Sequence, residues 1–203
     1  VNEAALFAVR RGAHEIHAED VEAARDRVLM GLKRESMVLS DEEKEVVAFH
    51  EAGHAVLAYV LEHADPVHKV TILPTGYALG VTQQLPIEER HIYKKEYIAD
   101  SIVVALGGRI AEELVFGHTS TGAQNDLVRI TETARRMVRE WGMSERIGPM
   151  AWGQQGAVFL GEDLVQTRDY SDDTARVIDE EVERILREQE ERCRVTLSAH
   201  RNA

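Results

Sequence analysis

The chain contains almost no cysteine and no long apolar run. Cys193 is the one cysteine among 203 residues, so an internal disulfide is excluded and the composition fits a reducing compartment. Its place in a heavily charged helical pattern argues against a role as a nucleophile. No signal peptide is present, and no apolar stretch approaches the roughly eighteen residues of a membrane span, so this chain by itself is expected to be soluble.

Positive charge is also scarce. The chain has 24 Lys and Arg against 36 Asp and Glu, which gives a formal net charge of −12 at pH 7. Phosphate backbones repel so acidic a chain, and its basic residues form isolated pairs rather than a patch, at 10–11, 94–95 and 135–136. We therefore expect no nucleic-acid partner. A G-x-x-x-x-G-K-[ST] phosphate loop is missing as well, so these residues are not expected to bind ATP in the usual way.

The hydrophobic residues and their spacing predict a mainly α fold. Hydrophobic residues make up 44% of the chain, enough for one main domain with a sizeable core and a small appendage. Apolar residues recur at helical spacing over residues 1–11, 18–30, 40–62, 92–116, 121–141 and 171–198. We expect the pattern over 92–116 to be interrupted at the Gly-Gly pair 107–108, and residues 142–168 to be irregular.

A small β-hairpin is predicted between the helical patterns. Residues 67–73 and 78–85 are rich in β-branched and apolar side chains, and Pro-Thr-Gly separates them at 74–76. A short linker over 33–39 is expected to precede the longest of the early helices.

The most informative stretch is residues 50–54, which read H-E-x-x-H inside a helical pattern. Histidines four residues apart lie about 40° apart around a helix and about 6 Å apart along it, so both imidazoles can bind one ion. Zinc suits neutral imidazoles with a fourth position left open for water. His50 and His54 are therefore predicted metal ligands. Glu51 is the predicted general base, placed to take a proton from the zinc-bound water as that water attacks a carbonyl.

The pattern around this motif places it on a buried helical face. Ser40 and Glu43 form a capping box at the start of the helix. The two histidines share one stripe with apolar residues at helical spacing, namely Val46, Val47, Leu57, Ala58 and Leu61. Two core histidines held by hydrogen bonds would give the same pattern, but burying two imidazoles and an acid without an ion is costly.

A catalytic zinc site needs a third protein ligand, and none follows the motif directly. The metzincin continuation has Gly and His three and six residues after the second histidine, whereas this chain has Leu57 and Val60 there. The ligand must therefore come from a distant segment.

Two distant acids are candidates. Glu112 lies in a helical run, and Asp126 lies in the first turns of a helix that a capping box of Thr121 and Gln124 would start. Each acid also has an ordinary interpretation, because Asp126 would complement a helix N-terminus and Glu112 would lie on a solvated face. Spacing alone does not rank them.

Three motifs resemble, in order and spacing, the peptidase domain of FtsH-type ATP-dependent zinc metalloproteases. They are H-E-x-x-H at 50–54, G-G-R-I-A-E-E at 107–113 and S-T-G-A-Q-N-D at 120–126. The flanks agree, because residues 1–8 resemble the final helices of that family's AAA+ ATPase module. W-G-M-S at 141–144 and D-T-A-R at 173–176 resemble later peptidase signatures, so the resemblance covers nearly the whole chain.

The resemblance implies roles that spacing left open. His50, His54 and Asp126 would bind one zinc ion per chain, and Glu51 would be the catalytic base. Glu112 would then lie behind a ligand, where its carboxylate can accept the other ring N–H of a histidine, or it would be purely structural.

The resemblance also implies an organisation for the whole protein. Residues 1–33 would be the C-terminal helices of the ATPase lid, truncated, and residues 34–203 the zinc peptidase domain; ATP would bind only in the missing module. Val1 opens within an uncapped helical pattern, which fits a truncated N-terminus. Family members form homo-oligomeric, six-fold rings anchored by N-terminal transmembrane helices, so the full-length protein is expected in a bacterial or organellar inner membrane, with this domain on the cytoplasmic, matrix or stromal side.

The predicted hairpin offers a place for substrate. Peptidases with such a helix commonly hold the substrate backbone as an added strand, because main-chain pairing is indifferent to sequence. Gly80, Val81 and Thr82 are the candidate edge, although a plain structural hairpin gives the same pattern.

The sequence thus predicts a zinc-dependent endopeptidase. Its substrates would be unfolded or membrane-extracted polypeptides delivered by an AAA+ module, as in protein quality control. The alternative is a non-catalytic, metal-stabilised assembly scaffold, but a structural site has no use for an acid between its ligands and usually has a fourth protein ligand, which Cys193 is poorly placed to supply. A zinc enzyme that hydrolyses a small amide is a second alternative.

Overall fold

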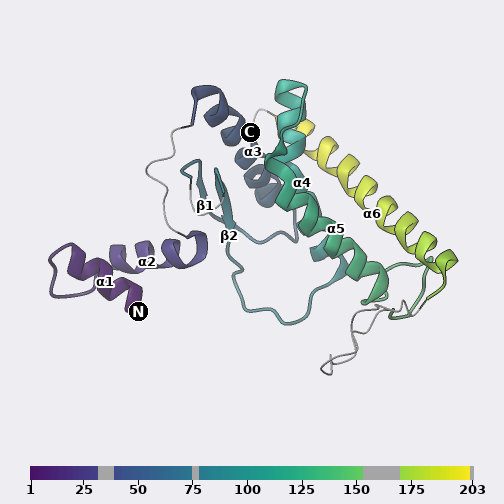
Figure 1. The fold of residues 1–203 in the computed structure, drawn as a ribbon, viewed down its shortest axis with the longest axis horizontal. Helices are drawn as coiled ribbons and strands as arrows, with labels where there is room; N and C mark the ends of the chain where they lie inside the picture. Colours follow the sequence, from purple (N-terminus) through teal and green to yellow (C-terminus); the bar gives the residue numbers. More distant parts are fainter. Residues whose placement is uncertain (32–38, 75–77, 153–169, 202–203) are drawn as a thin grey trace, which may run out of the picture.

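The computed structural model describes residues 1–31, 39–74, 78–152 and 170–201. Within them the elements follow the order α1 (Asn2–Arg10), α2 (Ala18–Met30), α3 (Asp41–Val60), β1 (Val67–Thr71), β2 (Val81–Gln84), α4 (Lys95–Phe116), a 3-10 turn η1 (Thr121–Ala123), α5 (Gln124–Arg139) and α6 (Asp172–Ala199). The predicted mainly α fold with a small antiparallel hairpin is confirmed (Figure 1). Most of the predicted linker, most of the turn at 74–76 and much of the irregular connection fall on residues outside this description.

Helix α3 begins where the sequence predicted. The Ser40 hydroxyl accepts a hydrogen bond from the backbone N–H of Glu43 at 3.2 Å, and the Glu43 carboxylate accepts one from the backbone N–H of Ser40 at 2.8 Å. This capping box satisfies two N–H groups that the first turn leaves without partners. It fixes the start of the helix, and with it the direction in which residues 50–54 face.

Helix α4 is continuous, so the predicted interruption at 107–108 is wrong. The glycines serve close packing instead. A Cβ atom added to Gly53 of α3 would lie 2.3 Å from the carbonyl oxygen of Gly107, and one added to Gly107 would lie 2.7 Å from the carbonyl oxygen of Gly53. The two helices therefore cross with backbone against backbone, which no larger residue permits at either position.

The core lies where α3, α4, α5 and α6 meet. In α5 the buried residues recur at helical spacing, as Ile130, Ala134, Met137 and Val138. Fully buried Leu57 of α3 and Ile102 of α4 belong to the same cluster. Burying each large apolar side chain contributes roughly 1.5–3 kcal/mol to folding stability. The core therefore holds α3 against α4, α5 and α6.

Helix α6 lies along α4 and completes this core (Figure 1). Its Cys193 is fully buried, and burial raises the pKa of the thiol to about 12, so the thiolate is not available as a nucleophile.

Arg192 of α6 donates a hydrogen bond of 2.6 Å to buried Asp100 of α4, which also accepts one of 3.0 Å from the backbone N–H of His63. These contacts join the end of α3 to α4 and α6.

The hairpin packs beside α3. Strands β1 and β2 are antiparallel, with Val70 opposite Thr82 and Thr71 opposite Val81, and the register is irregular between Val67 and Lys69. Both strands are shorter than predicted.

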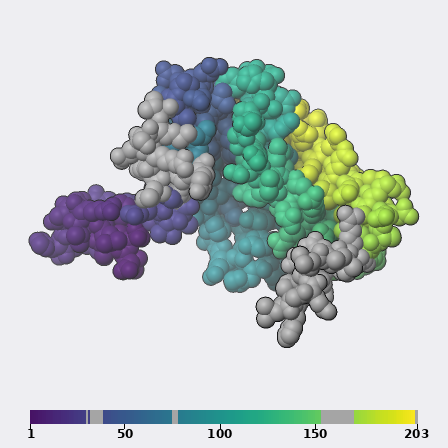
Figure 2. Space-filling model, viewed as in Figure 1, coloured from purple at the N-terminus to yellow at the C-terminus, as the bar shows by residue number. Residues whose placement is uncertain are grey.

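Helices α1 and α2 form a separate pair that projects from the rest of the molecule (Figures 1 and 2). Buried alanines line their contact, and Arg27 of α2 forms an ion pair of 3.2 Å with Glu3 of α1. An ion pair of Asp26 with Lys69 connects α2 to β1. The described helices include none that is long and apolar enough to cross a membrane.

Candidate metal centre

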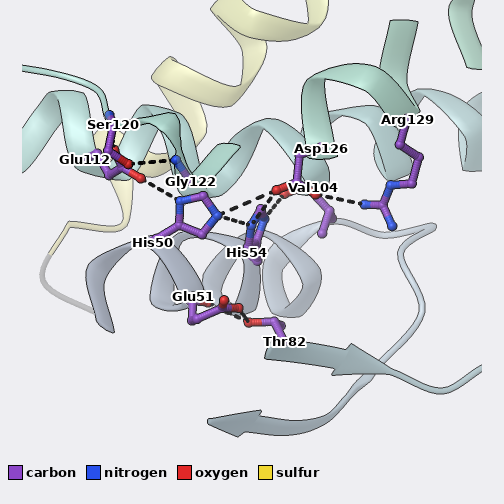
Figure 3. Close-up of polar contacts among 10 residues, drawn as sticks. All are labelled: His50, Glu51, His54, Thr82, Val104, Glu112, Ser120, Gly122, Asp126 and Arg129. Carbon is purple, nitrogen blue, oxygen red and sulfur yellow. Dashed lines mark hydrogen bonds and ion pairs between the residues drawn. The ribbon is translucent and has the colours of Figure 1, made fainter. Parts of the chain in front are cut away.

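The two histidines of α3 face each other. The Nε2 atoms of His50 and His54 are 3.0 Å apart, and each side chain is about nine-tenths buried (Figure 3). The His50 Nδ1–H donates to the Glu112 carboxylate at 2.7 Å, and the His54 Nδ1–H donates to the Val104 carbonyl at 2.7 Å. Because both acceptors lie on the Nδ1 side, both Nε2 atoms present lone pairs to the same point. Two such lone pairs repel each other unless a cation lies between them.

Asp126 supplies the third atom. Its Oδ2 lies 3.6 Å from Nε2 of His50 and 3.6 Å from Nε2 of His54. A zinc ion with ligands about 2.1 Å away in a tetrahedral shell separates those ligands by about 3.4 Å. The separations of 3.0, 3.6 and 3.6 Å fit one such ion. Among the residues that the structure describes, these three form the one group of its kind.

The local fold brings Asp126 to this point. The predicted capping box of Thr121 with Gln124 is not formed, because the 3-10 turn η1 starts the helix and its cap is Ser120, whose hydroxyl accepts from the N–H of Gly122 at 3.1 Å. Asp126 still lies in the first turn of α5, as predicted. There its carboxylate also complements the positive end of the helix.

The charges around Asp126 favour its ionised form. Burial opposes ionisation, but hydrogen bonding to His50 and His54 when these rings are protonated, together with the charge of Arg129 at 3.6 Å from Oδ1, outweighs burial and holds the pKa of Asp126 well below its usual value. Asp126 is therefore anionic at neutral pH, as a ligand of a divalent cation must be.

The environment of His50 shows the same preference for positive charge. Burial favours the neutral ring, but Asp126, Glu112 and the charge of Glu51 outweigh burial and raise the pKa of His50. A proton or a metal ion is thus stabilised at this position.

Glu112 lies behind His50, away from the three ligand atoms. Its side chain is 1% exposed. One carboxylate oxygen accepts from His50, and the other accepts from the backbone N–H of Ser120 at 2.6 Å (Figure 3). Glu112 therefore connects a histidine to the loop that leads into Asp126. One turn earlier in α4, a Cβ atom added to Gly108 would lie 2.4 Å from the His50 ring, so this glycine makes room for the imidazole.

Glu51 faces the hairpin. Its carboxylate accepts a hydrogen bond of 2.6 Å from the hydroxyl of Thr82 on β2 (Figure 3). A cleft of about 740 Å³ contains this carboxylate together with His50, His54 and Asp126, and the predicted edge residues from Gly80 to Thr82 line it as well. The atoms that could bind a metal, the acid and the strand thus share one cavity.

Sequence reasoning missed four of these features. They are the ring contact of Gly108, the carbonyl of Val104, the cap at Ser120 and the side chain of Thr82, a residue for which the sequence predicts only a backbone role. Three of them depend on packing between distant segments. The cap at Ser120 is a local contact with Gly122, and the S-T-G run at 120–122 carried a local signal for it.

Comparison with known proteins gives consistent matches. Residues 37–203 match the sequence model of peptidase family M41. The chain is 70% identical over 200 residues to the ATP-dependent zinc metalloprotease FtsH of Acidimicrobium ferrooxidans, which covers 98% of this chain and 30% of that protein. It is 52% identical over 204 residues to FtsH 2 of Salinibacter ruber and 48% identical over 204 residues to FtsH of Bacillus subtilis, covering 30% and 32% of those proteins. The chain therefore spans about a third of the length of the curated relatives it matches.

Proposed function

The chain belongs to peptidase family M41, and from this we propose that it is the proteolytic part of an ATP-dependent zinc metalloendopeptidase. The resemblance inferred from its motifs is thereby confirmed. The observation that carries the proposal is the convergence of His50, His54 and Asp126 in one cleft with the acid Glu51.

In this proposal His50, His54 and Asp126 hold one zinc ion. The fit rests on two lone pairs and one carboxylate oxygen at separations suited to a single ion. When bound, zinc polarises the scissile carbonyl and lowers the pKa of the attacking water. Glu112 keeps the Nδ1 proton of His50 in place, so that Nε2 remains the ligand atom.

Glu51 moves the proton. Its carboxylate accepts the proton of the attacking water and then passes it to the departing amine nitrogen, so that one group acts first as base and then as acid. Water is the nucleophile in this proposal, and the one cysteine of the chain is buried in α6 and does not line the cleft. Burial of Glu51, which is 6% exposed, strengthens its electrostatic interactions with the reacting atoms.

The substrate is an extended polypeptide that pairs with β2. Strand β2 has β1 on one side, and residues from Gly80 to Thr82 line the cleft. A substrate strand added at this edge would be held by main-chain hydrogen bonds, which suits unfolded chains of any sequence. The strand that lines the cleft therefore favours a peptide over a small amide as substrate.

The remaining parts of the proposal concern the full-length protein. Its relatives are named ATP-dependent, and they are about three times as long as this chain. We therefore assign residues 1–33 to the end of an AAA+ lid and residues 34–203 to the peptidase. An AAA+ module would deliver unfolded or membrane-extracted polypeptides to a six-fold ring of such domains, anchored in a bacterial or organellar inner membrane and facing the cytoplasm, matrix or stroma.

Metal analysis combined with proteolysis tests the proposal. The purified chain should contain about one zinc per chain and cleave denatured casein, and a chelator should abolish cleavage. ATP should have no effect on this chain, because it has no phosphate loop. Casein that stays intact under assembling conditions at full zinc occupancy would instead support the metal-stabilised scaffold.

A further inference from the structure

Strand β2 holds the Glu51 side chain through a hydroxyl. The Thr82 Oγ1 lies 2.6 Å from Oε2 of Glu51 and 3.0 Å from the backbone carbonyl oxygen of the same residue. Hydrogen bonds from a hydroxyl to a carboxylate are typically 2.5–2.7 Å long and stronger than neutral ones, so the hydroxyl proton is directed at the carboxylate. Within the described part of the chain, no other hydrogen bond or ion pair reaches these carboxylate oxygens.

Gly80, the residue before the strand, also restricts Glu51 by contact. A Cβ atom added to Gly80 would lie 2.7 Å from Oε1 of Glu51, 2.8 Å from its Cγ and 2.7 Å from Cγ1 of Val47. The backbone at Gly80 therefore lies directly against the acid. Gly80 directly precedes β2 and Thr82 is the second residue of the strand, so two neighbouring positions of this segment contact Glu51.

We propose that Thr82 is a positioning residue that holds the Glu51 carboxylate in the orientation needed for proton transfer. The inference rests on the proposed role of Glu51 as the base. A glutamate side chain has three rotatable bonds, and without an anchor its carboxylate samples orientations from which it cannot reach the water. Because Thr82 lies on the strand that pairs with substrate, binding of a substrate strand to β2 also steadies the hydroxyl that orients the base.

Substitution of Thr82 separates this role from simple support of the hairpin. Thr82→Val keeps the branched shape that suits a strand but removes the hydroxyl, whereas Thr82→Ser keeps the hydroxyl. We expect Thr82→Val to lower kcat for peptide cleavage about 10- to 100-fold, with zinc content and KM close to wild type. Thr82→Ser should retain most of the turnover. The control is Thr71→Val in β1. The Thr71 hydroxyl accepts a hydrogen bond from the N–H of Leu73 outside the cleft, so its removal should leave kcat unchanged.

A binding measurement tests the orientation of the Glu51 carboxylate without relying on catalytic turnover. A peptide hydroxamate binds the metal of the loaded chain and presents its hydroxyl to Glu51. Calorimetric titration should show about 10-fold weaker binding to Thr82→Val than to wild type, and near wild-type binding to Thr82→Ser.

The double variant shows whether Thr82 acts through Glu51. In a Glu51→Gln background, Thr82→Val should cause no further loss of activity, because the group it positions is already inactive. Equal losses in both backgrounds, a rise in KM alone, or unchanged kcat and hydroxamate affinity in Thr82→Val would overturn the inference. Full activity of Glu51→Gln would instead refute the proposed role of the base, so the two failures are distinguishable.

Discussion

At the metal centre, each histidine has its ring proton fixed by an acceptor from α4. His50 donates to the carboxylate of Glu112 and His54 to the carbonyl of Val104, which leaves both Nε2 atoms free for an ion. The carbonyl cannot be removed by a side-chain substitution, but the carboxylate can. Glu112 and Asp126 therefore have different expected effects on zinc, since in the proposed site Glu112 orients a ligand and Asp126 is itself a ligand.

Removing each acid in turn distinguishes these roles. Asp126→Ala leaves two imidazoles and water, so zinc affinity should fall by several orders of magnitude. Glu112→Ala spares all three ligands and should weaken binding only about 10- to 100-fold. Zinc titration in competition with a chelator measures both, with helix content checked by circular dichroism.

A neighbouring acid provides the control for these variants. Glu113 forms an ion pair of 3.0 Å with Arg194 at the surface, so Glu113→Ala should leave zinc affinity unchanged. If Glu112→Ala abolished binding while Asp126→Ala bound zinc normally, the assignment of the third ligand would be reversed.

Among the elements, the crossing of α3 and α4 determines the geometry of the site. Gly53 and Gly107 bring the two backbones into contact, and Gly108 lies against the ring of His50. Alanine is the better helix former by about 1 kcal/mol, so substitution at these positions would stabilise the helix if space were available. It is not available at any of the three.

Two alanine substitutions should therefore separate packing from metal binding. Gly107→Ala meets the backbone of α3, and overpacking should destabilise the chain by about 1–3 kcal/mol despite the gain in helix propensity. Gly108→Ala meets the imidazole of His50 and should lower zinc affinity more than it lowers stability. Thermal unfolding and zinc titration of both variants test this. Higher melting temperatures with unchanged zinc binding would show that the helices do not cross this closely.

Local signals in the sequence predicted most of the elements. The capping box of Ser40, the period of the apolar residues and the H-E-x-x-H spacing placed α3 and its histidines, because each depends on residues within a turn or two. The glycine pair at 107–108 is ambiguous in the sequence, because glycine weakens helices and also permits close packing, and only the partner helix decides between these roles. The contact of Glu112 with His50 joins residues 62 apart in sequence, and that of Thr82 with Glu51 joins residues 31 apart. No local pattern encodes either contact.

Across the whole molecule, the cleft connects three segments that have different tasks. Helix α3 supplies the two histidines and the acid, α5 supplies Asp126, and β2 supplies the proposed substrate edge and the hydroxyl that contacts the acid. The pair α1 and α2 lies outside the cleft and reaches β1 through the ion pair of Asp26 with Lys69. The central claim is that this cleft is a hydrolytic site and not a structural metal site.

Replacement of Glu51 by glutamine tests that claim most directly. The amide has nearly the same shape as the carboxylate but cannot accept a proton. The variant should bind one zinc per chain with wild-type affinity, while its rate of casein cleavage should fall by about three orders of magnitude or more. Zinc content and casein cleavage are measured on the same preparation beside the wild-type chain. Cleavage at the wild-type rate, or loss of the metal, would contradict the account.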